Sequence, residues 1–202
     1  MPTYKLIYFN VTGLGEPIRL LLHQSGIKFE DKRMAFEEWP DVKPKMPMGQ
    51  VPVLEIDGKP HHQSKAICRL IARKNNLYGA NEEESYQIDA TIETIDDLRQ
   101  AISQYYWEED PAFKARLKET ALKKLPVYVD KFEEQVKKNG GFFVGGKLTW
   151  ADLMYTGYTE TLSAMTESEL NKDHPELQKL VAKVRALPNI KAYLDKRPKT
   201  LF

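Results

Sequence analysis

The first third of the chain carries short apolar stretches separated by turn residues, whereas the remainder follows a helical period. Four short strands are predicted, over residues 4–9, 29–33, 51–56 and 59–62. Asp57-Gly58 separates the last two strands and is the strongest hairpin signal in the chain. A helix is predicted from Pro17, which suits a first helical turn, to Gly26, which can end a helix with a positive φ.

Two further features complete this part of the chain. Residues 39–48 contain three prolines, so we expect a loop or a broken helix there. Ser64 can cap a helix whose apolar face continues to Ile71. The order is then strand, helix, strand, loop, two strands and helix. The first strand–helix–strand unit should be parallel and right-handed, and the last two strands antiparallel, which is a thioredoxin-like layout.

The sequence beyond residue 82 has a helical pattern throughout. Isoleucine and leucine recur at steps of three and four from Ile88 to Ile102, which predicts a helix over 83–109. A second helix is predicted over 111–139, with a kink at Pro126.

A third long helix is predicted from Thr149 to about residue 165. Thr149 and Asp152 are three residues apart and resemble a capping box at its start. Pro175 and Pro188 each lie near the start of a further short helix.

The pattern therefore predicts two domains of different class. An α/β thioredoxin-like domain with a mixed four-stranded sheet is expected over 1–78, followed by an all-helical domain over 82–202. Charge differs between them, because residues 1–78 carry 12 Lys and Arg against 8 Asp and Glu. The more basic first domain is the better candidate for an acidic ligand.

Composition excludes several classes of function. The 202 residues include 30 Lys and Arg and 29 Asp and Glu, so the net charge gives no electrostatic case for nucleic acid. No apolar run approaches the roughly 20 residues of a membrane helix, and no signal-peptide core precedes the first strand. A single cysteine, Cys68, excludes an intrachain disulfide and favours a reducing compartment. We expect a cytoplasmic protein with no membrane partner, and no metal site beside His61 and His62, which lack further ligands.

A thioredoxin-like domain often performs thiol redox chemistry, but the Cys-x-x-Cys that this requires is missing after the first strand. The remaining use of the scaffold is to bind a thiol that belongs to another molecule. Tyr8, near the end of that strand, could donate a hydrogen bond to a thiolate and so favour its ionised form. A core aromatic side chain is the simpler interpretation from propensity alone.

Three further pairs of residues could bind a peptide, although each has an ordinary structural explanation. A cis Val51-Pro52 bond would expose the Val51 main chain to a peptide, but a trans proline at a strand start is commoner. Ser64 and its neighbour Gln63 could hold a carboxylate at a helix N-terminus or simply cap it. Trp39 and Lys43 could both donate hydrogen bonds to a carboxylate, or they could simply be a packed indole and a solvated ammonium. Together these pairs describe a site for a short thiol peptide with two carboxylates.

In combination, the motifs resemble those of the sigma-class cytosolic glutathione S-transferases of the invertebrate type. The resemblance covers essentially the whole chain in order. It is carried by Tyr8 in KLIYFN and by the segments 15–19, 39–40, 49–55, 62–64, 148–152 and 196–198.

The resemblance implies a thioredoxin-like domain that binds glutathione as a co-substrate, with no tightly bound cofactor. Tyr8 would stabilise the glutathione thiolate, and Val51, before a cis Pro52, would clamp the cysteinyl main chain. Residues at both ends of the tripeptide would complete the site. These are Trp39, Lys43 and Gln50 for the glycyl end or its neighbouring backbone, and Gln63 and Ser64 for the γ-glutamyl end.

The same resemblance implies a homodimer, in which the partner subunit's Asp97 would reach the amine of glutathione. Thr149 and Asp152 would be critical for folding rather than for catalysis.

One position departs from the family pattern. Many sigma-class relatives carry arginine where this chain has Leu14, and that arginine lies near the thiol. Its loss should weaken thiolate stabilisation and make the electrophile pocket more apolar. The pocket is expected beside Tyr8, between the domains. Its candidate lining residues are Phe9, Leu14, Tyr105, Tyr106 and Trp107, with Phe202 a weaker candidate.

The resemblance implies conjugation of glutathione to small apolar electrophiles, such as lipid-derived unsaturated aldehydes, as a detoxification reaction. Two alternatives stay open. One is a prostaglandin-type isomerase or a peroxidase that also uses glutathione, and Leu14 disfavours the isomerase. The other is a non-catalytic, crystallin-like structural protein, which the intact set of glutathione-site residues disfavours.

Overall fold

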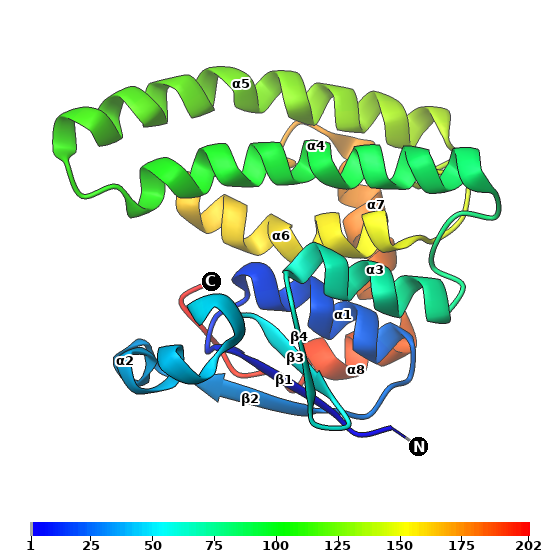
Figure 1. Ribbon diagram of the computed structural model, residues 1–202. Coiled ribbons are helices and arrows are strands. Elements are labelled where there is room, and N and C mark those ends of the chain that lie inside the picture. The colour runs from blue at the N-terminus through cyan, green and yellow to red at the C-terminus, as the bar shows by residue number, and fades with distance from the viewer. Residues whose placement is uncertain (1) are drawn as a thin grey trace.

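The computed structural model describes residues 2–202 and places a mixed β-sheet below a layer of long helices (Figure 1). Four strands form the sheet in the order β2-β1-β3-β4. The strands are β1 (Tyr4–Phe9), β2 (Glu30–Met34), β3 (Val53–Ile56) and β4 (Lys59–His62). β1 is parallel to β2 and antiparallel to β3, and β3 is antiparallel to β4. The predicted strand directions and fold class are confirmed.

Two helices pack on one face of this sheet, α1 (Glu16–Gln24) and α3 (Ser64–Lys74). Gly26 ends α1 with a φ of 64°, as the sequence predicts. β3 begins two residues later than predicted, because Pro52 has no backbone N–H to give to a ladder. Ser64 is the first helical residue of α3 and not its cap, since Gln63 occupies the cap position with a φ of 72°.

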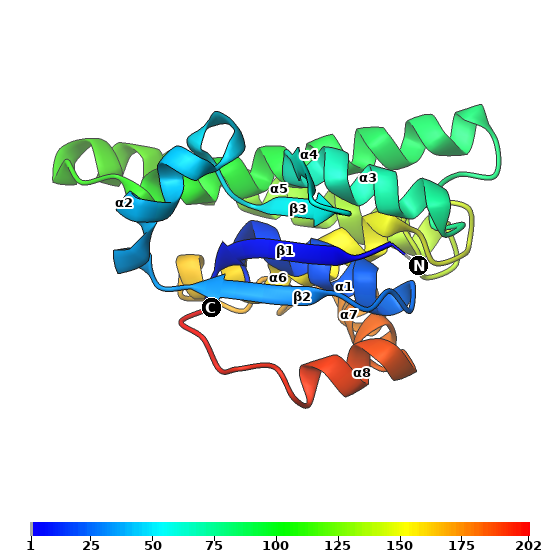
Figure 2. The ribbon, with the colours of Figure 1, turned by 60° about the horizontal axis from the view of Figure 1, so that its bottom comes forward.

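The segment between β2 and β3 is irregular, as its prolines predict. It contains the single-turn helix α2 (Trp39–Val42) and three 3₁₀ turns, over Phe36–Glu38, Lys43–Lys45 and Pro47–Gly49. Figure 2 shows this segment projecting beyond one end of the sheet. It therefore stands beside the end of β1, where Tyr8 and Phe9 lie.

The rest of the chain is helical. Its helices are α4 (Glu82–Trp107), α5 (Pro111–Lys138), α6 (Trp150–Thr166), α7 (Pro175–Arg185) and α8 (Pro188–Leu194). α5 continues through Pro126 as one helix, and its ribbon is curved in Figure 1. No helix within residues 2–202 is both long and apolar enough to cross a membrane.

Helix α6 joins the helical layer to the sheet domain. The Trp150 N–H donates to the Leu77 carbonyl at 2.9 Å, which ties the start of α6 to the end of the sheet domain. At its middle, α6 packs on α1 so closely that a Cβ on Gly157 would lie 2.9 Å from the backbone nitrogen of Pro17. The first helix of one domain is thus held against the central helix of the other.

The C-terminal segment returns to the sheet domain. After α8 it runs back to the end of β1, as Figure 2 shows. The Thr12 N–H donates to the Phe202 carbonyl at 2.8 Å, and Arg197 Nη1 lies 2.6 Å from a carboxylate oxygen of Glu16. The last residues of the chain therefore border the loop that follows β1.

Candidate active site

Tyr8 lies on β1, one residue before its end, and its ring packs against the following loop. The Leu14 N–H donates a hydrogen bond to the Tyr8 hydroxyl oxygen at 3.0 Å. Two glycines make room for the ring, because a Cβ on Gly13 would lie 2.7 Å from the hydroxyl oxygen and a Cβ on Gly15 would lie 2.5 Å from Cδ1. The loop therefore fixes the hydroxyl in one place.

The electrostatic surroundings keep this phenol protonated. Burial raises the pKa of Tyr8 above its usual value of 10.0, while the Leu14 N–H and the positive charges of Arg19 and Arg99 oppose part of that rise. Within residues 2–202 the hydroxyl takes part in no other hydrogen bond, so its own proton is available to an acceptor. A neutral phenol placed in this way is a hydrogen-bond donor, not a general base.

A cavity of about 520 Å³ opens beside the end of β1. It collects seven residues that the sequence analysis singled out for glutathione. The seven are Trp39, Lys43, Gln50, Val51, Pro52, Gln63 and Ser64. Phe9, Leu14, Gly49 and His62 complete the lining. Side chains from β1, the irregular segment and the start of α3 thus meet around one space.

Local backbone geometry presents polar groups to this cavity. The Val51-Pro52 peptide bond is cis, and Gln50 before it is extended, with φ −137° and ψ 153°. An extended main chain next to a cavity can pair with a peptide as a strand does. Ser64 begins α3, whose first N–H groups have no intrahelical acceptor and favour an anion.

Gln63 adopts a backbone conformation that non-glycine residues rarely occupy, with a φ of 72°. Strain of this kind costs on the order of 1–3 kcal/mol and persists where surrounding structure enforces it. Here it places the exposed Gln63 side chain and the Ser64 hydroxyl on the same cavity.

A second cavity, of about 420 Å³, adjoins the first and shares Phe9, Leu14 and Val51 with it. Tyr8 lines this second cavity, together with Trp107 and Phe202. Its other lining residues are not among those predicted from the sequence. These are Val11, Gly13, Phe36, Arg99, Ser103, Tyr158, Thr161 and Met165.

Two of the predicted pocket residues, Tyr105 and Tyr106, do not line this cavity. Tyr105 is buried in the helical layer, and its hydroxyl donates to the Met165 carbonyl at 3.0 Å. Tyr106 packs between Trp107 and Phe202, with ring centroids 5.0 and 6.1 Å away. Only one side of α4 can face the cavity, and Trp107 occupies it.

Arg99 and Ser103 share that side, because they precede Trp107 by eight and four residues. Helical spacing from Trp107 would have found both positions in the sequence. Phe36 carries a weaker signal, since it lies in an irregular segment and meets Phe9 only in the folded chain, at a ring distance of 4.6 Å.

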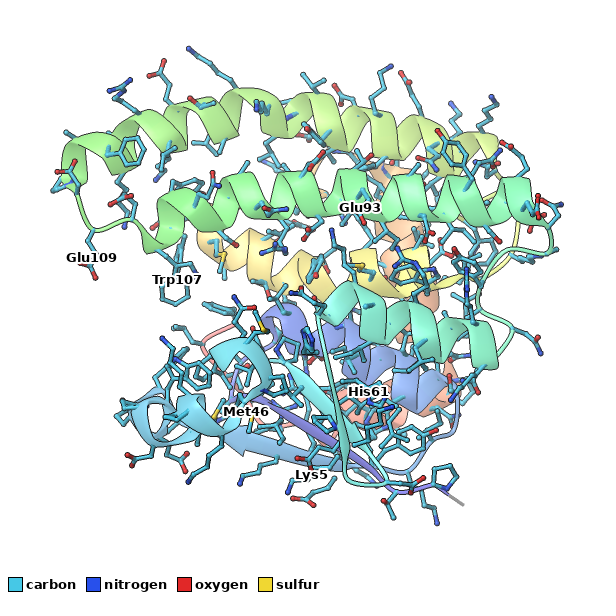
Figure 3. All side chains as sticks on the ribbon, viewed as in Figure 1. Lys5, Met46, His61, Glu93, Trp107 and Glu109 are labelled. Atoms are coloured by element: carbon cyan, nitrogen blue, oxygen red, sulfur yellow. The ribbon has the colours of Figure 1, made fainter. Side chains whose placement is uncertain are left out.

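Trp107 closes the outer end of the second cavity. Figure 3 shows it pointing from the last turn of α4 toward the sheet domain. Its ring lies 6.4 Å from that of Phe36, yet 57% of the residue is exposed. The helical layer and the irregular segment therefore approach each other through these two aromatic rings.

Asp97 lies outside both cavities, exposed on α4. Its neighbour Asp96 is buried and accepts from Arg99 Nε at 2.6 Å and from Lys65 Nζ at 2.9 Å. Cys68 is fully buried, and burial raises the pKa of its thiol, so it is a poor nucleophile. No group of three metal-ligating side chains occurs within residues 2–202.

Comparisons with known proteins agree with this fold and its cavities. Residues 4–73 match the family model described as "Glutathione S-transferase, N-terminal domain", and residues 96–197 match "Glutathione S-transferase, C-terminal domain". A glutathione S-transferase of Anopheles gambiae is 43% identical over 201 residues, covering 99% of each chain. A hematopoietic prostaglandin D synthase of Rattus norvegicus is 37% identical over 201 residues, again covering 99% of each chain.

A solved structure is also closely similar. Prostaglandin synthase D of Nilaparvata lugens superposes with a TM-score of 0.93 at 43% identity, covering 98% of this chain and 100% of that one. The chain belongs to the glutathione S-transferase family. Members of this family are transferases that use glutathione as a co-substrate and hold no tightly bound cofactor.

Proposed function

We propose that this protein is a sigma-class glutathione transferase that binds glutathione in the 520 Å³ cavity and activates its thiol with Tyr8. The observation that carries the proposal is the convergence of seven candidate glutathione residues on one cavity that adjoins the cavity of Tyr8. These residues come from three separate parts of the sheet domain, and they include donors for the two carboxylates of the tripeptide.

The tripeptide would bind with its two ends apart. Its glycyl carboxylate lies by Trp39 and Lys43, with Gln50 beside the neighbouring backbone. Its γ-glutamyl end lies by Gln63 and Ser64, at the start of α3. These residues line the same cavity, and every one of them comes from a turn or a helix end. The cysteinyl main chain would pair with Val51, next to the cis Pro52.

The reaction would use a thiolate held by Tyr8. The neutral phenol donates a hydrogen bond to the sulfur, which lowers the pKa of the bound thiol because the hydrogen bond favours the charged form, and the thiol proton leaves to solvent. The thiolate then attacks the β-carbon of an unsaturated aldehyde in the second cavity, and the carbon–sulfur bond forms as the carbon–carbon π bond breaks. The electron pair passes to the carbonyl oxygen, and water then gives a proton to the α-carbon. The enzyme contributes activation and proximity. The aromatic and aliphatic lining suits apolar electrophiles such as lipid-derived unsaturated aldehydes.

The proposal assigns separate tasks to the two parts of the chain. Residues 1–78 would hold glutathione, and residues 82–202 would supply the electrophile cavity and the contacts of a homodimer. In that dimer the partner subunit's Asp97 would reach the glutathione amine, which fits an aspartate that lies exposed and outside the cavities of its own chain. A cytoplasmic detoxification role follows from this chemistry.

A second candidate is isomerisation of a prostaglandin-type endoperoxide, or reduction of a peroxide, with glutathione. The similarity to prostaglandin synthases of a rat and a planthopper favours it. Leu14 disfavours the isomerisation, because this residue lies where many sigma-class relatives place an arginine near the thiol, and it lines both cavities.

Glutathione binding and product analysis test the proposal. The purified protein is expected to bind immobilised glutathione, and Ser64→Ala should weaken binding about tenfold by removing one hydrogen bond to a charged group. Initial rates with trans-2-nonenal should exceed rates of endoperoxide isomerisation. Failure of the unaltered protein to bind glutathione would favour the crystallin-like alternative. Isomerisation without conjugation would favour the second candidate.

A further inference from the structure

The electrophile cavity contains a charge that its apolar character does not explain. Arg99 has the one charged side chain among its described lining residues. Nothing in the conjugation of an uncharged electrophile requires an arginine there. We propose that Arg99 makes this cavity selective for electrophiles that carry a carboxylate beside an apolar body. The inference rests on the proposed function and specifies the class of second substrate.

Arg99 has hydrogen-bonding capacity to spare. Its Nε donates to Asp96 at 2.6 Å, and within residues 2–202 neither of its Nη atoms has a hydrogen-bond acceptor. Only 17% of the side chain is exposed, so the guanidinium lies in the cavity wall rather than in open solvent. A guanidinium presents its donors as a planar fork that fits the two oxygens of a carboxylate.

Arg99 belongs to a cluster of two cations and two carboxylates, in which only its Nε is used. Asp96 also accepts from Lys65 Nζ at 2.9 Å and from Gln100 Nε2 at 3.0 Å. Lys65 is also paired with Glu93, so within residues 2–202 Asp96 is the carboxylate that serves Arg99. No described lining residue of the cavity carries a carboxylate side chain, and the free Nη atoms of Arg99 are the groups that an acidic ligand would bind.

The cavity has one polar end and one apolar end along α4. Arg99, Ser103 and Trp107 follow each other at steps of four on the side that lines it. At a rise of 1.5 Å per residue, the ends of this row are about 12 Å apart. Arg99 is the more buried end, and Trp107 is exposed at the outer end (Figure 3). A ligand with a carboxylate and an apolar body matches this arrangement.

Tyr158 on α6 is a second, independent feature of the same end. It lines the cavity and is 1% exposed, yet its hydroxyl has no hydrogen-bond partner within residues 2–202. The guanidinium carbon of Arg99 lies 5.9 Å from the centre of its ring. A buried hydroxyl without a partner is costly, so Tyr158 adds an unsatisfied polar group to the residues around Arg99.

The carboxylate would take no part in bond making. With an α,β-unsaturated ketone, the glutathione thiolate attacks the β-carbon, and the carbon–sulfur bond forms as the π bond breaks. The electron pair passes to the carbonyl oxygen, and water then gives a proton to the α-carbon. Arg99 holds the acid group in both the ground and the transition state, so its effect should fall mainly on KM.

Ethacrynic acid and its primary amide form a suitable pair of probes, because both are α,β-unsaturated ketones and only the acid is charged. We expect the unaltered enzyme to prefer the acid. Arg99→Met should lower kcat/KM for the acid about tenfold or more, and for the amide less than about twofold. Arg99→Lys keeps the charge without the fork and should lie between them. Arg116→Met, an exposed change of equal charge on α5, should leave both values unchanged.

Several outcomes would overturn the inference. One is an equal preference of the unaltered enzyme for acid and amide. Another is an equal loss with both probes in Arg99→Met, with the pH–rate profile moved to higher pH, which would place the action of Arg99 on the sulfur. Asp96 keeps Lys65 as a partner in that variant, and retention on immobilised glutathione verifies its folding. If the unaltered protein neither binds glutathione nor conjugates either probe, the proposed function itself fails.

Discussion

At the scale of single residues, Tyr8 combines two roles that the sequence presents as alternatives. Its ring belongs to the core, and only 7% of the residue is exposed. Its hydroxyl nevertheless lies at a cavity, held by the Leu14 N–H at 3.0 Å. Burial and function are compatible because Gly13 and Gly15 let the loop close over the ring without covering the oxygen.

Tyr8→Phe should therefore change the chemistry more than the binding. Loss of a hydrogen bond to a charged group costs about 1.5–3 kcal/mol, so turnover at neutral pH should fall about 10- to 100-fold. The pKa of the bound thiol should rise by about 1–2 units, moving the pH–rate profile to higher pH. The affinity for glutathione should change little.

Stopped-flow absorbance of the bound thiolate against pH, with calorimetric titration of glutathione, measures these effects. Tyr86→Phe, at an exposed position on α4, is the matched control. An unaltered pH–rate profile in Tyr8→Phe would remove Tyr8 from the mechanism.

At the scale of elements, the start of α6 is fixed by several buried hydrogen bonds to one carboxylate. The Asp152 carboxylate accepts from the Phe143 N–H at 2.8 Å, from the Thr149 N–H at 2.7 Å and from the Thr149 hydroxyl at 3.0 Å. Burial raises the pKa of Asp152 to about 6, and these hydrogen bonds oppose the rise. The predicted capping residues thus also connect α6 to the loop before it.

Asp152→Ala should destabilise the protein far more than loss of an ordinary cap. Three buried donors would lose their acceptor, which should cost about 3–5 kcal/mol in the free energy of unfolding. Asp110→Ala removes the cap of α5, an exposed carboxylate with one hydrogen bond to the Phe113 N–H at 2.7 Å, and should cost about 1 kcal/mol. Urea unfolding followed by circular dichroism measures both. Similar losses in the two variants would contradict the argument.

At the scale of the whole molecule, the two parts of the chain meet along α1 and α6. A Cβ on Gly157 would lie 2.9, 3.0 and 3.1 Å from three atoms of Pro17, two of them in the backbone. Pro17 lies in the first turn of α1, directly after the loop whose Leu14 N–H donates to the Tyr8 hydroxyl. The distance between α1 and α6 therefore determines the position of the helical layer relative to the loop that contacts Tyr8.

Gly157→Ala should force α1 and α6 apart. Overpacking of this kind costs about 1–3 kcal/mol, partly offset by the better helix propensity of alanine, so the protein should lose about 1–2 kcal/mol of stability. Conjugation should slow several-fold, because the loop between β1 and α1, which fixes the Tyr8 hydroxyl, would move with α1. Thermal unfolding and kcat/KM for trans-2-nonenal measure the two effects.

Gly26→Ala is the comparison for this variant. Gly26 has a φ of 64° and open space around it. The variant should therefore lose stability through backbone strain without slower conjugation. If Gly157→Ala is as stable and as active as the unaltered protein, the close approach of α1 and α6 matters neither for stability nor for activity.

Much of this protein follows from the sequence alone. Strands, helices and their ends depend on neighbours a few residues away, so the Asp57-Gly58 turn and the capping pair of α6 could be predicted. The hydrogen-bond donors at the start of α3 and in the irregular segment could also be predicted as a ligand site, because their chemistry depends on residue type and local sequence. The expected role of the partner subunit's Asp97 stays a prediction.

Only the tertiary structure decided which sides of the helices face the site. Tyr105 and Trp107 lie on the same helix, and period alone does not say that Tyr105 enters the core while Trp107, and with it Arg99, lines a cavity. That choice depends on which surfaces pack against α4, and these come from segments up to a hundred residues away. Phe202 reaches the site for the same reason, through a backbone hydrogen bond to Thr12 that no local pattern encodes.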